Sequence, residues 1–391
     1  MNRRRFLALA ASTPFLAAMQ APKTWRVAVI GHTGRGNYGH GLDTLWRQVP
    51  GCQIVAVADA DEAGLAAARK KLGVEQGFGD YRQMLKATRP DIVSIAPRFL
   101  DEHRDMALAA IEAGARGIYV EKPFCRTPGE ADEIVAACSK AGTKLAVAHR
   151  NRWHPALVHA KKLVEDGGIG RLLEVRCRGK EDARGGGVDL WVLGTHDLNL
   201  ALLFTGPATA CTATMLADGK PATPADITQG SDAVGPVAGN ELHARWETES
   251  GVPIFFDSIA KAGTPEVNFG LQLIGTKGLI DFRIDLPKFA HVVFGSPTLA
   301  TNEPRVWTPI TSAGVGKPEP VAELHRRLAA HIIPALDLLS AIEESRPPLC
   351  SDRDAAATIE MVSAAFASHR QNGARVTLPL ANREHPLAGW K

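Results

Sequence analysis

The sequence has no marked excess of charge of either sign, no long apolar run and no internal repeat. Its 391 residues include 45 basic and 42 acidic side chains, and without Arg3, Arg4 and Arg5 the basic count falls to 42, equal to the acidic count. This balance argues against a nucleic acid as partner. No stretch reaches the ~20 apolar residues that a membrane-spanning helix needs, which predicts no stable membrane span in the mature protein.

Metal-binding cysteine patterns are also missing. The six cysteines form no C-x-x-C pair, and the spacing of His103, Glu181 and His196 supports no metal site either. Disulfides are allowed in an oxidising compartment, but buried free thiols are the favoured interpretation for a chain of this size. The cysteines are Cys52, Cys125, Cys138, Cys177, Cys211 and Cys350.

Acidic residues are absent before Asp43, and the chain begins with a basic cluster. Arg3–Leu7 (Arg-Arg-Arg-Phe-Leu) precedes a short apolar stretch that ends near Met19. This start resembles a twin-arginine export signal. It predicts that residues 1–21 direct the folded protein through the twin-arginine machinery to the periplasm, with cleavage near Ala21. The alternative is the basic, frayed start of a cytoplasmic protein.

A glycine-rich turn stands between two apolar runs. Residues 27–30 (Val-Ala-Val-Ile) lead into Gly31, and the run 54–58 ends in Asp59. A strand, a glycine turn, a helix and a second strand that ends in a carboxylate are typical of dinucleotide binding. The turn would let the backbone approach the pyrophosphate, the next helix would donate N–H groups, and Asp59 would accept from a ribose hydroxyl. We therefore predict a nicotinamide-nucleotide enzyme.

This turn fits the glycine pattern in two frames. Counted from the strand, glycine is expected at 31, 33 and 36, but Thr33 holds the middle position; the frame of Gly34, Gly36 and Gly39 starts three residues later. No arginine near Asp59 is available for a 2′-phosphate, which favours NAD over NADP. Because the periplasm offers little free NAD, an exported enzyme would bind its cofactor tightly before export. The predicted contacts are Gly31, Thr33, Gly34, Arg35, Gly36 and Asp59.

The residues 22–148 are predicted to form a Rossmann domain, a doubly wound parallel sheet with helices on both faces. Short apolar runs alternate there with helical patterns. The expected strands are 26–30, 53–58, 91–96, 117–120 and 144–148, and the expected helices are 61–72 and the segment from the capping sequence 127–130 to Gly142.

The residues 149–391 are predicted to form an α+β domain with a largely antiparallel open sheet. Period-two alternation marks strands there, and a short turn predicts one hairpin. The strands are expected at 241–248, 269–274 and 279–284, the helices at 155–166, 321–344 (bent or broken by Pro334) and 352–369, and loops at 217–238 and 295–319.

Glu121-Lys122-Pro123 follows the predicted strand 117–120, at the carboxyl edge where a doubly wound sheet binds its cofactor. Lys122 would stand near the nicotinamide and exchange a proton with a substrate oxygen during hydride transfer. The alternative is a solvated ion pair before a turn.

Polar side chains gather between residues 181 and 196. A tryptophan among carboxylates suits a sugar, whose apolar face stacks while its hydroxyls bond to charged groups. A solvated loop is the other interpretation. The residues are Glu181, Asp182, Arg184, Asp189, Trp191, Thr195 and His196.

With the glycine turn and Asp59, three more segments resemble the Gfo/Idh/MocA family of oxidoreductases, named after glucose–fructose oxidoreductase and inositol dehydrogenase. They are Ser94–Pro97 with His103, Glu121–Pro123, and Gly185–Gly187 with Gly194–His196. The resemblance covers essentially the whole mature chain. It implies a Rossmann domain, a C-terminal α/β domain whose sheet packs in homo-oligomers (dimers or tetramers), and a sugar or cyclitol substrate.

The resemblance also implies roles for single residues. Lys122 matches the catalytic lysine, and His196 matches the histidine of an Asp-x-x-x-His motif that relays protons or holds substrate. Cofactor contacts are implied for Pro97, His103, Glu121 and Lys122, and substrate contacts for His149, Arg152, Asp182, Trp191 and His196.

The sequence departs from the family within that motif. Val192 stands at the aspartate position, and Asn199 replaces an acidic residue common three places past the histidine. Either Asp189 supplies the carboxylate through a local bulge, or the chemistry is altered. Three functions follow: an NAD(H)-dependent sugar oxidoreductase, a glycoside-cleaving enzyme that oxidises its substrate transiently with tightly bound NAD, and a non-catalytic nucleotide-bound binding protein.

Overall fold

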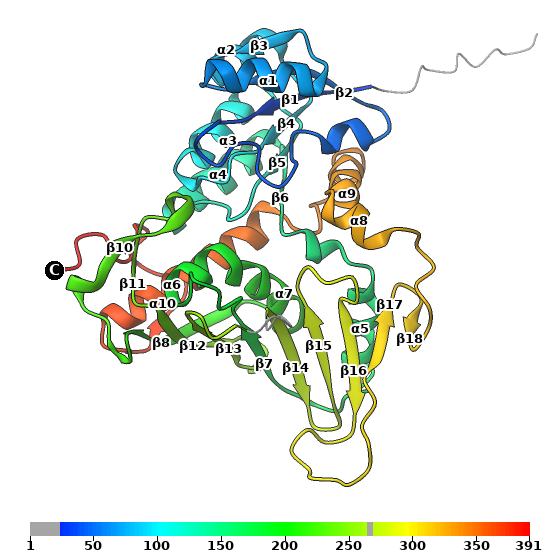
Figure 1. Cartoon of the computed structure of the whole chain (residues 1–391), viewed down its shortest axis with the longest axis vertical. Helices are drawn as coiled ribbons and strands as arrows, with labels where there is room; N and C mark the ends of the chain where they lie inside the picture. Colours follow the sequence, from blue (N-terminus) through cyan, green and yellow to red (C-terminus); the bar gives the residue numbers. More distant parts are fainter. Residues whose placement is uncertain (1–23, 264–268) are drawn as a thin grey trace, which may run out of the picture.

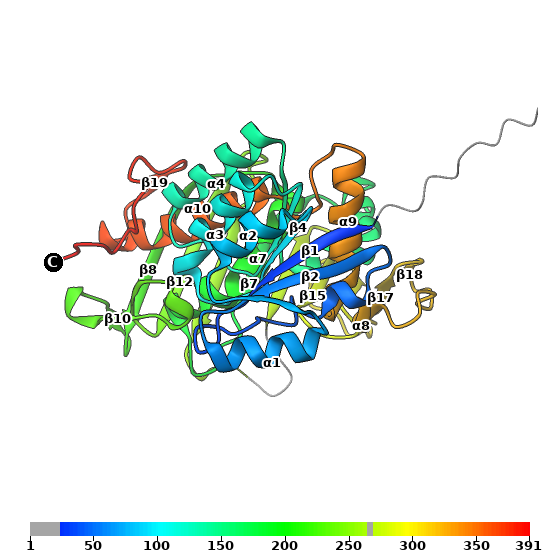
Figure 2. The ribbon, with the colours of Figure 1, turned by 90° about the horizontal axis from the view of Figure 1, so that it is seen from above.

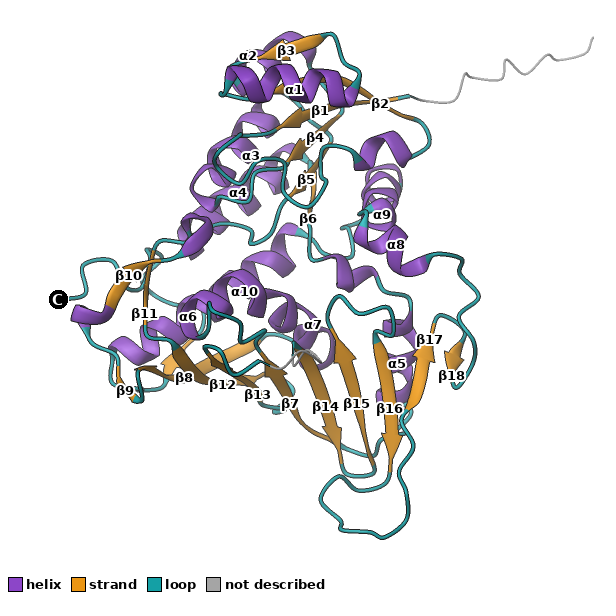
Figure 3. Ribbon diagram, in the orientation of Figure 1, coloured by secondary structure: helices purple, strands orange, loops and turns teal. Residues whose placement is uncertain are grey.

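The computed structural model describes residues 24–263 and 269–391, and the predicted export signal at 1–21 lies outside these ranges. A domain built on a parallel sheet, blue to cyan in Figure 1, lies above a broad second sheet. Helices α7 and α10 lie between the two sheets (Figure 3). Within the described ranges, no helix combines the length and the apolar character needed to cross a membrane.

Six parallel strands form the first sheet, in the order β3-β2-β1-β4-β5-β6. The predicted Rossmann domain is confirmed, although β3 and α2 had not been predicted. Figure 2 shows this domain from above. The strands are β1 (Trp25–Ile30), β2 (Cys52–Ala58), β3 (Gln76–Phe78), β4 (Ile92–Ile95), β5 (Gly117–Val120) and β6 (Lys144–Val147), and the helices are α1 (Glu62–Leu72), α2 (Tyr81–Thr88), α3 (His103–Glu112) and α4 (Pro128–Ala141).

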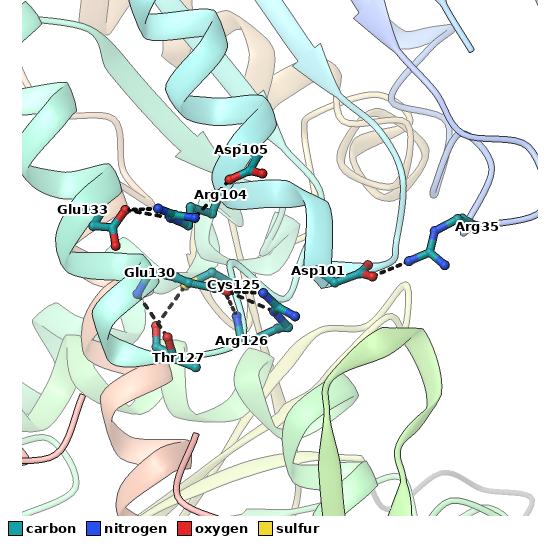
Figure 4. A network of polar contacts seen from close by, with 9 residues as sticks. All are labelled: Arg35, Asp101, Arg104, Asp105, Cys125, Arg126, Thr127, Glu130 and Glu133. Atoms are coloured by element: carbon teal, nitrogen blue, oxygen red, sulfur yellow. Dashed lines mark hydrogen bonds and ion pairs between the residues drawn. The ribbon is translucent and has the colours of Figure 1, made fainter. Parts of the chain in front are cut away.

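Single side chains determine where these helices begin and end. Asp61 accepts a backbone N–H from the first turn of α1, and Gly73 ends that helix in the left-handed conformation, with φ of 70°. Before α4, Thr127 Oγ1 accepts from the backbone N–H of Glu130 at 3.1 Å, as predicted. The Glu130 carboxylate does not return to Thr127 but accepts from the backbone N–H of Arg126 at 2.8 Å (Figure 4).

No α-helix follows β1 directly, so the prediction of a helix N-terminus behind the glycine turn is wrong. Residues 31–44 form successive turns and bridges, and the first helical element is the 3-10 segment η1 (Leu45–Gln48). Gly34, Gly36, Gly39 and Gly41 have φ of 82°, 83°, 57° and 90°. A right-handed helix cannot include such left-handed residues.

The second domain contains an eleven-stranded sheet, in the order β18-β17-β16-β15-β14-β7-β13-β12-β8-β19, with β9 beside β8. Only β7 and β13 pair in parallel among the described strands of this sheet, which confirms the predicted largely antiparallel sheet. The strands are β7 (Leu172–Arg178), β8 (Ala208–Ala217), β9 (Lys220–Pro221), β12 (Glu241–Thr248), β13 (Ile254–Ile259), β14 (Gly270–Gly275), β15 (Gly278–Arg283), β16 (Ala290–Phe294), β17 (Thr308–Thr311), β18 (Gly314–Val315) and β19 (Val376–Thr377).

Short strands also form inside the two segments predicted as loops. Residues 217–238 contain β9 and the separate hairpin of β10 (Ile227–Gln229) and β11 (Pro236–Ala238), and 295–319 contain β17 and β18. These strands have two to four residues, too few for an alternating pattern to stand out in the sequence.

The helices of the second domain include one predicted helix that is divided in two. The helix expected at 321–344 breaks at His331, three residues before Pro334, which lies in the first turn of α9. A first-turn N–H has no acceptor within the helix, so proline is tolerated there. The helices are α5 (Ala156–Glu165), α6 (Gly186–Asp189), the π-helix η4 (Leu190–Gly194), α7 (Thr195–Thr205), α8 (Leu324–Ala329), α9 (Ile332–Glu343) and α10 (Asp352–Arg370).

The last two helices return to the first domain. Helix α9 contacts β5 and β6, and α10 contacts α4 and β6. One buried apolar cluster therefore includes residues of both domains. All six cysteines are free and five are buried, which confirms the predicted thiols. Burial raises the pKa of Cys138 and of Cys350 to about 12, so both thiols stay protonated.

Candidate active site

A cavity of ≈ 200 Å³ lies where the carboxyl edge of the parallel sheet faces the second domain. Lys122 and His196, both predicted as catalytic, line it together. Lys122 follows β5, whereas His196 is in the first turn of α7, so each domain contributes one of the two groups.

Lys122 is held inside this cavity with only 8% of its surface exposed. Its Nζ donates to the backbone oxygen of Val192 at 2.9 Å. Burial lowers the pKa of Lys122, although the negative charge of Glu121 opposes that effect. A lysine with a lowered pKa is suited to accept a proton and return it.

Glu121 is fully buried behind Lys122, so the two residues are not a solvated pair. Its carboxylate accepts from the backbone N–H of His40 at 2.9 Å and of Lys122 at 2.7 Å, and it also contacts the His40 ring. Burial raises the pKa of Glu121, but the hydrogen bond and the charge of His40 outweigh it and bring the pKa to about 2. Glu121 therefore stays ionised and joins the glycine-rich turn to the end of β5.

His196 is supported by a second buried histidine, His149. The two Nδ1 atoms are 3.3 Å apart, and the rings meet edge to face at 88°. Burial, with a contribution from the charge of Lys122, lowers the pKa of His149 to about 3. Burial also lowers the pKa of His196 well below its ordinary value. Both rings are neutral, so one Nδ1–H donates to the other Nδ1 and holds the orientation of His196.

The structure does not bring Asp189 to Lys122. Its Oδ2 accepts from Ser258 Oγ at 2.6 Å and from the backbone N–H of Glu181 at 2.9 Å, and Asp189 does not line the cavity. The π-helix that follows Asp189 is a local irregularity of the anticipated kind, but it presents the carbonyl of Val192 to Lys122 and no carboxylate.

Two residues predicted as substrate contacts are instead structural. Trp191 is fully buried and stacks on His385, with ring centroids 6.0 Å apart. Arg152 donates to Asp354 at 3.1 Å and to the carbonyl of Asn199, which ties the segment after β6 to α7 and α10. Neither side chain lines the cavity.

The residues predicted at the cofactor edge also have protein partners. The His103 ring is buried between the carbonyl oxygens of Pro97, at 2.7 Å, and Phe124, at 3.1 Å. Arg35 pairs with Asp101 across the loop after β4 (Figure 4). These contacts position the loops around the cofactor edge.

Sequence analysis missed His331 and two of the three arginines that line the cavity, Arg98 and Arg150. His331 is buried before α9, and its Nδ1 lies 2.6 Å from the hydroxyl of Tyr119. Burial lowers the pKa of His331 to about 4, so the ring is neutral. Arg98 and Arg150 directly follow segments that had been singled out, but nothing in their spacing identified them. The return of α9 to the first domain, which alone places His331 here, has no signal in the sequence.

Asp59 lies at the end of β2, where a ribose-binding carboxylate is expected, and protein donors already saturate it. Oδ1 accepts from the backbone N–H of Thr33 and of Asp61, each at 3.0 Å. Oδ2 accepts from Thr33 Oγ1 at 2.7 Å and from the Tyr38 hydroxyl at 2.8 Å. Burial raises the pKa of Asp59, but these bonds outweigh it and lower the pKa overall. A carboxylate has about four lone-pair sites, and all four are used.

The glycine turn can accommodate a dinucleotide only if the side chain of Tyr38 moves. A Cβ built at Gly34 would meet no atom within 4 Å, so this part of the turn is open to a close ligand. The Tyr38 ring, however, covers Gly31, where a Cβ would lie 2.1 Å from it. A ribose hydroxyl can reach Asp59 by replacing the Tyr38 hydroxyl. The residues therefore fit NAD once Tyr38 withdraws.

Comparison with known proteins identifies the first domain. Residues 25–149 match the family described as "Oxidoreductase family, NAD-binding Rossmann fold" (GFO_IDH_MocA). This stretch is similar to the NAD-binding domain of the Gfo/Idh/MocA family. The predicted family resemblance is thereby confirmed for the domain that carries Asp59 and Lys122.

Curated relatives of this Gfo/Idh/MocA domain match part of the chain. D-apiose dehydrogenase of Paraburkholderia graminis is 39% identical over 125 residues, 32% of this chain and 33% of that protein. Levoglucosan dehydrogenase of Pseudarthrobacter phenanthrenivorans is 31% identical over 202 residues, 47% and 50% of the two chains. A 2,7-anhydro-N-acetylneuraminate hydratase of Mediterraneibacter gnavus is 28% identical over 153 residues, 39% and 38%. The chain thus spans a third to a half of these relatives.

A solved structure extends the likeness of fold to both domains. Levoglucosan dehydrogenase in complex with NADH and L-sorbose superimposes with a TM-score of 0.71 at 22% identity, over 92% of this chain and 100% of that one. The Gfo/Idh/MocA domain and the antiparallel sheet domain are therefore arranged as in a known two-domain fold.

Proposed function

We propose that the protein is an NAD-dependent oxidoreductase that acts on a hydroxyl group of a sugar or cyclitol derivative. Lys122 is the observation that carries this proposal, because it is a buried amine of lowered pKa in a cavity at the carboxyl edge of an NAD-binding domain. The names of the apiose and levoglucosan dehydrogenases support the substrate class.

In the proposed reaction, Lys122 transfers the proton and His196 positions the substrate. Bound NAD supplies the hydride acceptor for the substrate carbon. Lys122 Nζ, oriented by its bond to the Val192 carbonyl, takes the proton of the substrate hydroxyl. Neutral His196, held by His149, hydrogen-bonds a substrate oxygen and fixes the pose. The reverse reaction returns the proton from Lys122.

Replacement of Lys122 tests this assignment. Lys122→Ala should lower kcat by about 10²–10⁴, with NAD affinity measured by calorimetry unchanged. Lys162→Ala is the matched control, because Lys162 is exposed on α5 and pairs with Asp166 at 2.8 Å. Undiminished turnover of the Lys122 variant would remove the proton-transfer role.

A second candidate is net cleavage or hydration of a glycoside through transient oxidation by a retained NAD. It is favoured by the carbonyl that replaces a carboxylate beside Lys122, and by the relative named a hydratase. The purified protein is denatured and the released nucleotide identified by mass spectrometry. Retained NAD(H), with product release but no net NADH formation, supports this candidate; an empty protein that fails to bind added NAD(H) would favour a non-catalytic binding protein.

We also propose that the chain is exported through the twin-arginine machinery to the periplasm. The support is the sequence Arg3–Leu7 and the apolar residues after it. The double variant Arg3→Lys, Arg4→Lys should stay in the cytoplasm when the producing cells are fractionated, while the native chain reaches the periplasm. Equal periplasmic amounts would contradict the proposal.

A homo-oligomer joined through the second sheet is the assembly that we propose. Phe294 of β16 and Trp307, which precedes β17, are each 47% exposed, an apolar surface at one end of that sheet. Light scattering of the purified protein should give a dimer or a tetramer, and Trp307→Glu should shift it towards a monomer. A monomeric native protein would rule out this assembly.

A further inference from the structure

The cavity around Lys122 is strongly basic. Five of its lining residues are cationic types, whereas Asp232 and Asp285 are its only acidic lining residues among those described. The cations come from both domains. They are Arg98, Lys122 and Arg150 of the first domain and its exit, and Lys180 and Arg184 of the second.

Ion pairs neutralise only part of this charge. Arg150 pairs with Asp285 at 2.7 Å, and Arg184 pairs with Asp182. Within the described ranges, neither Arg98 nor Lys180 has an ion-pair partner. On the second-domain side of the cavity, Lys180 is therefore the cation that no ion pair with a described residue neutralises.

Arg98 lies on the side of the cavity where the phosphates of a dinucleotide are expected. The Arg98 backbone lies against the glycine turn, because its nitrogen would be 2.3 Å from a Cβ at Gly36. Lys180 and Arg184 belong to the segment between β7 and α6 of the second domain, which meets the substrate side of the cavity. Arg184 uses its Nε and Nη2 on Asp182, so N–H groups of its guanidinium stay available for a second anion.

We propose that the substrate is a monosaccharide-sized sugar acid, an aldonate or uronate, whose carboxylate is bound by Lys180 and Arg184 while one of its hydroxyls faces Lys122. This inference rests on the proposed function. A carboxylate can pair with Lys180, which has no ion-pair partner among the described residues, and can accept from the open N–H groups of Arg184; the volume of ≈ 200 Å³ suits a single sugar. Lys180 and Arg184 determine specificity here and take no part in the chemical step.

Binding is the readout of choice, because recognition of a carboxylate does not depend on which hydroxyl reacts. Holoenzyme loaded with NADH is titrated calorimetrically with D-glucuronate, D-galacturonate and D-gluconate, and with the neutral D-glucuronamide, D-glucose and D-galactose. At least one acid should bind about tenfold more tightly than its neutral counterpart, as expected for a charge-assisted bond. Its affinity should fall with added salt.

Variants assign the effect to the named residue. Lys180→Glu should abolish the preference for acids and leave the affinity for neutral sugars unchanged, and Lys180→Gln should have an intermediate effect. Lys220→Glu, at an exposed position of β9, is the matched control and should change nothing.

Three results would overturn the inference: equal binding of acids and neutral sugars, no binding of either, or tighter binding of D-glucose 6-phosphate than of every acid. None of these affects the proposed function, which the Lys122 variant and the nucleotide content test separately. A protein that binds no NAD(H) would instead contradict the proposed function itself.

Discussion

The side chain of Tyr38 occupies part of the expected NAD site, at Asp59 and Gly31. Its hydroxyl occupies a lone pair of Asp59 and its ring covers Gly31. Burial, with the hydrogen bond to Asp59, raises the pKa of Tyr38 far above the ordinary value, so the hydroxyl stays a donor. NAD must break this bond to place a ribose hydroxyl on Asp59.

Removal of that hydroxyl should therefore help the cofactor to bind. Tyr38→Phe is expected to lower the Kd for NAD by about threefold to tenfold, because a hydrogen bond of about 1 kcal/mol no longer competes with the ribose. Tyr81→Phe is the control, since Tyr81 stacks on Arg82 away from the turn. Weaker binding of the Tyr38 variant in calorimetry would mean that the hydroxyl contacts the nucleotide directly.

Asp197, next to His196, makes stability depend on pH. It is fully buried, and neither carboxyl oxygen has a hydrogen-bond partner among the described residues. Burial, with a contribution from the charge of Asp189, raises its pKa well above the ordinary value. Above pH ~4 the unfolded chain loses this proton and the folded protein keeps it, so the contribution of Asp197 to stability falls as pH rises, by at most about 1.4 kcal/mol per pH unit.

The asparagine of the Asp197→Asn variant cannot ionise in the folded or the unfolded protein. The variant therefore does not lose stability in this way as pH rises. Urea unfolding of both proteins from pH ~4 to pH ~7 should show the stability of the variant relative to the native chain increasing with pH. A constant difference across this range would show that Asp197 is ionised in the folded protein.

Within single helices and strands, the sequence predicts those features that residues close together in the chain determine, such as helix ends. Asp61, Gly73 and Thr127 mark helix ends, because capping bonds span only three or four residues. The three-residue strand β3 escaped prediction because it is too short for a period to be visible. The helix expected after β1 does not form, because glycines of the fingerprint adopt left-handed φ values.

In the candidate site, too, some residues could be located from local sequence and others depend on long-range packing. Lys122 could be located because it directly follows a strand at the carboxyl edge of a parallel sheet. Where the Asp189 side chain points depends on the π-helix η4, which directly follows it in the chain. A π-helical turn contains one residue more than an α-helical turn, and this extra residue rotates the neighbouring side chains about the helix axis. His331 depends on where α9 packs, a long-range contact that no local pattern records.

The start of α10 offers a test of capping at this scale. Ser351 and Asp354 form a reciprocal capping box, with Ser351 Oγ donating to Asp354 Oδ2 at 2.7 Å. Ser351→Ala should lower the free energy of unfolding by about 1 kcal/mol. Thr223→Ala removes the same box from the exposed 3-10 segment η5 (Pro224–Asp226), which buries no residue, and should change nothing measurable. Equal losses in urea titrations would mean that the effect is unrelated to the packing of α10.

For the whole molecule, the return of α9 to the first sheet joins the two domains into one folding unit. Gly117 of β5 has no side chain, and a Cβ there would lie 2.6 Å from Cδ1 of Ile342 in α9. Leu338, one turn earlier, is fully buried. Each such apolar side chain contributes about 1.5–3 kcal/mol through its burial, so the first domain lacks part of its core without the end of the chain.

Leu338→Ala should therefore destabilise both domains together, by about 2–5 kcal/mol. Hydrogen exchange followed by mass spectrometry should show protection falling by a similar free energy in β1 and in β12, although β12 lies in the other domain. Leu349→Ala is the control, because Leu349 is 54% exposed and its loss should leave both strands protected. If protection fell in β1 but not in β12, the domains would unfold independently, and the cavity between them could open without loss of either fold. A fall in both would mean that Lys122 and His196 are held together by the same cooperative transition that folds the chain.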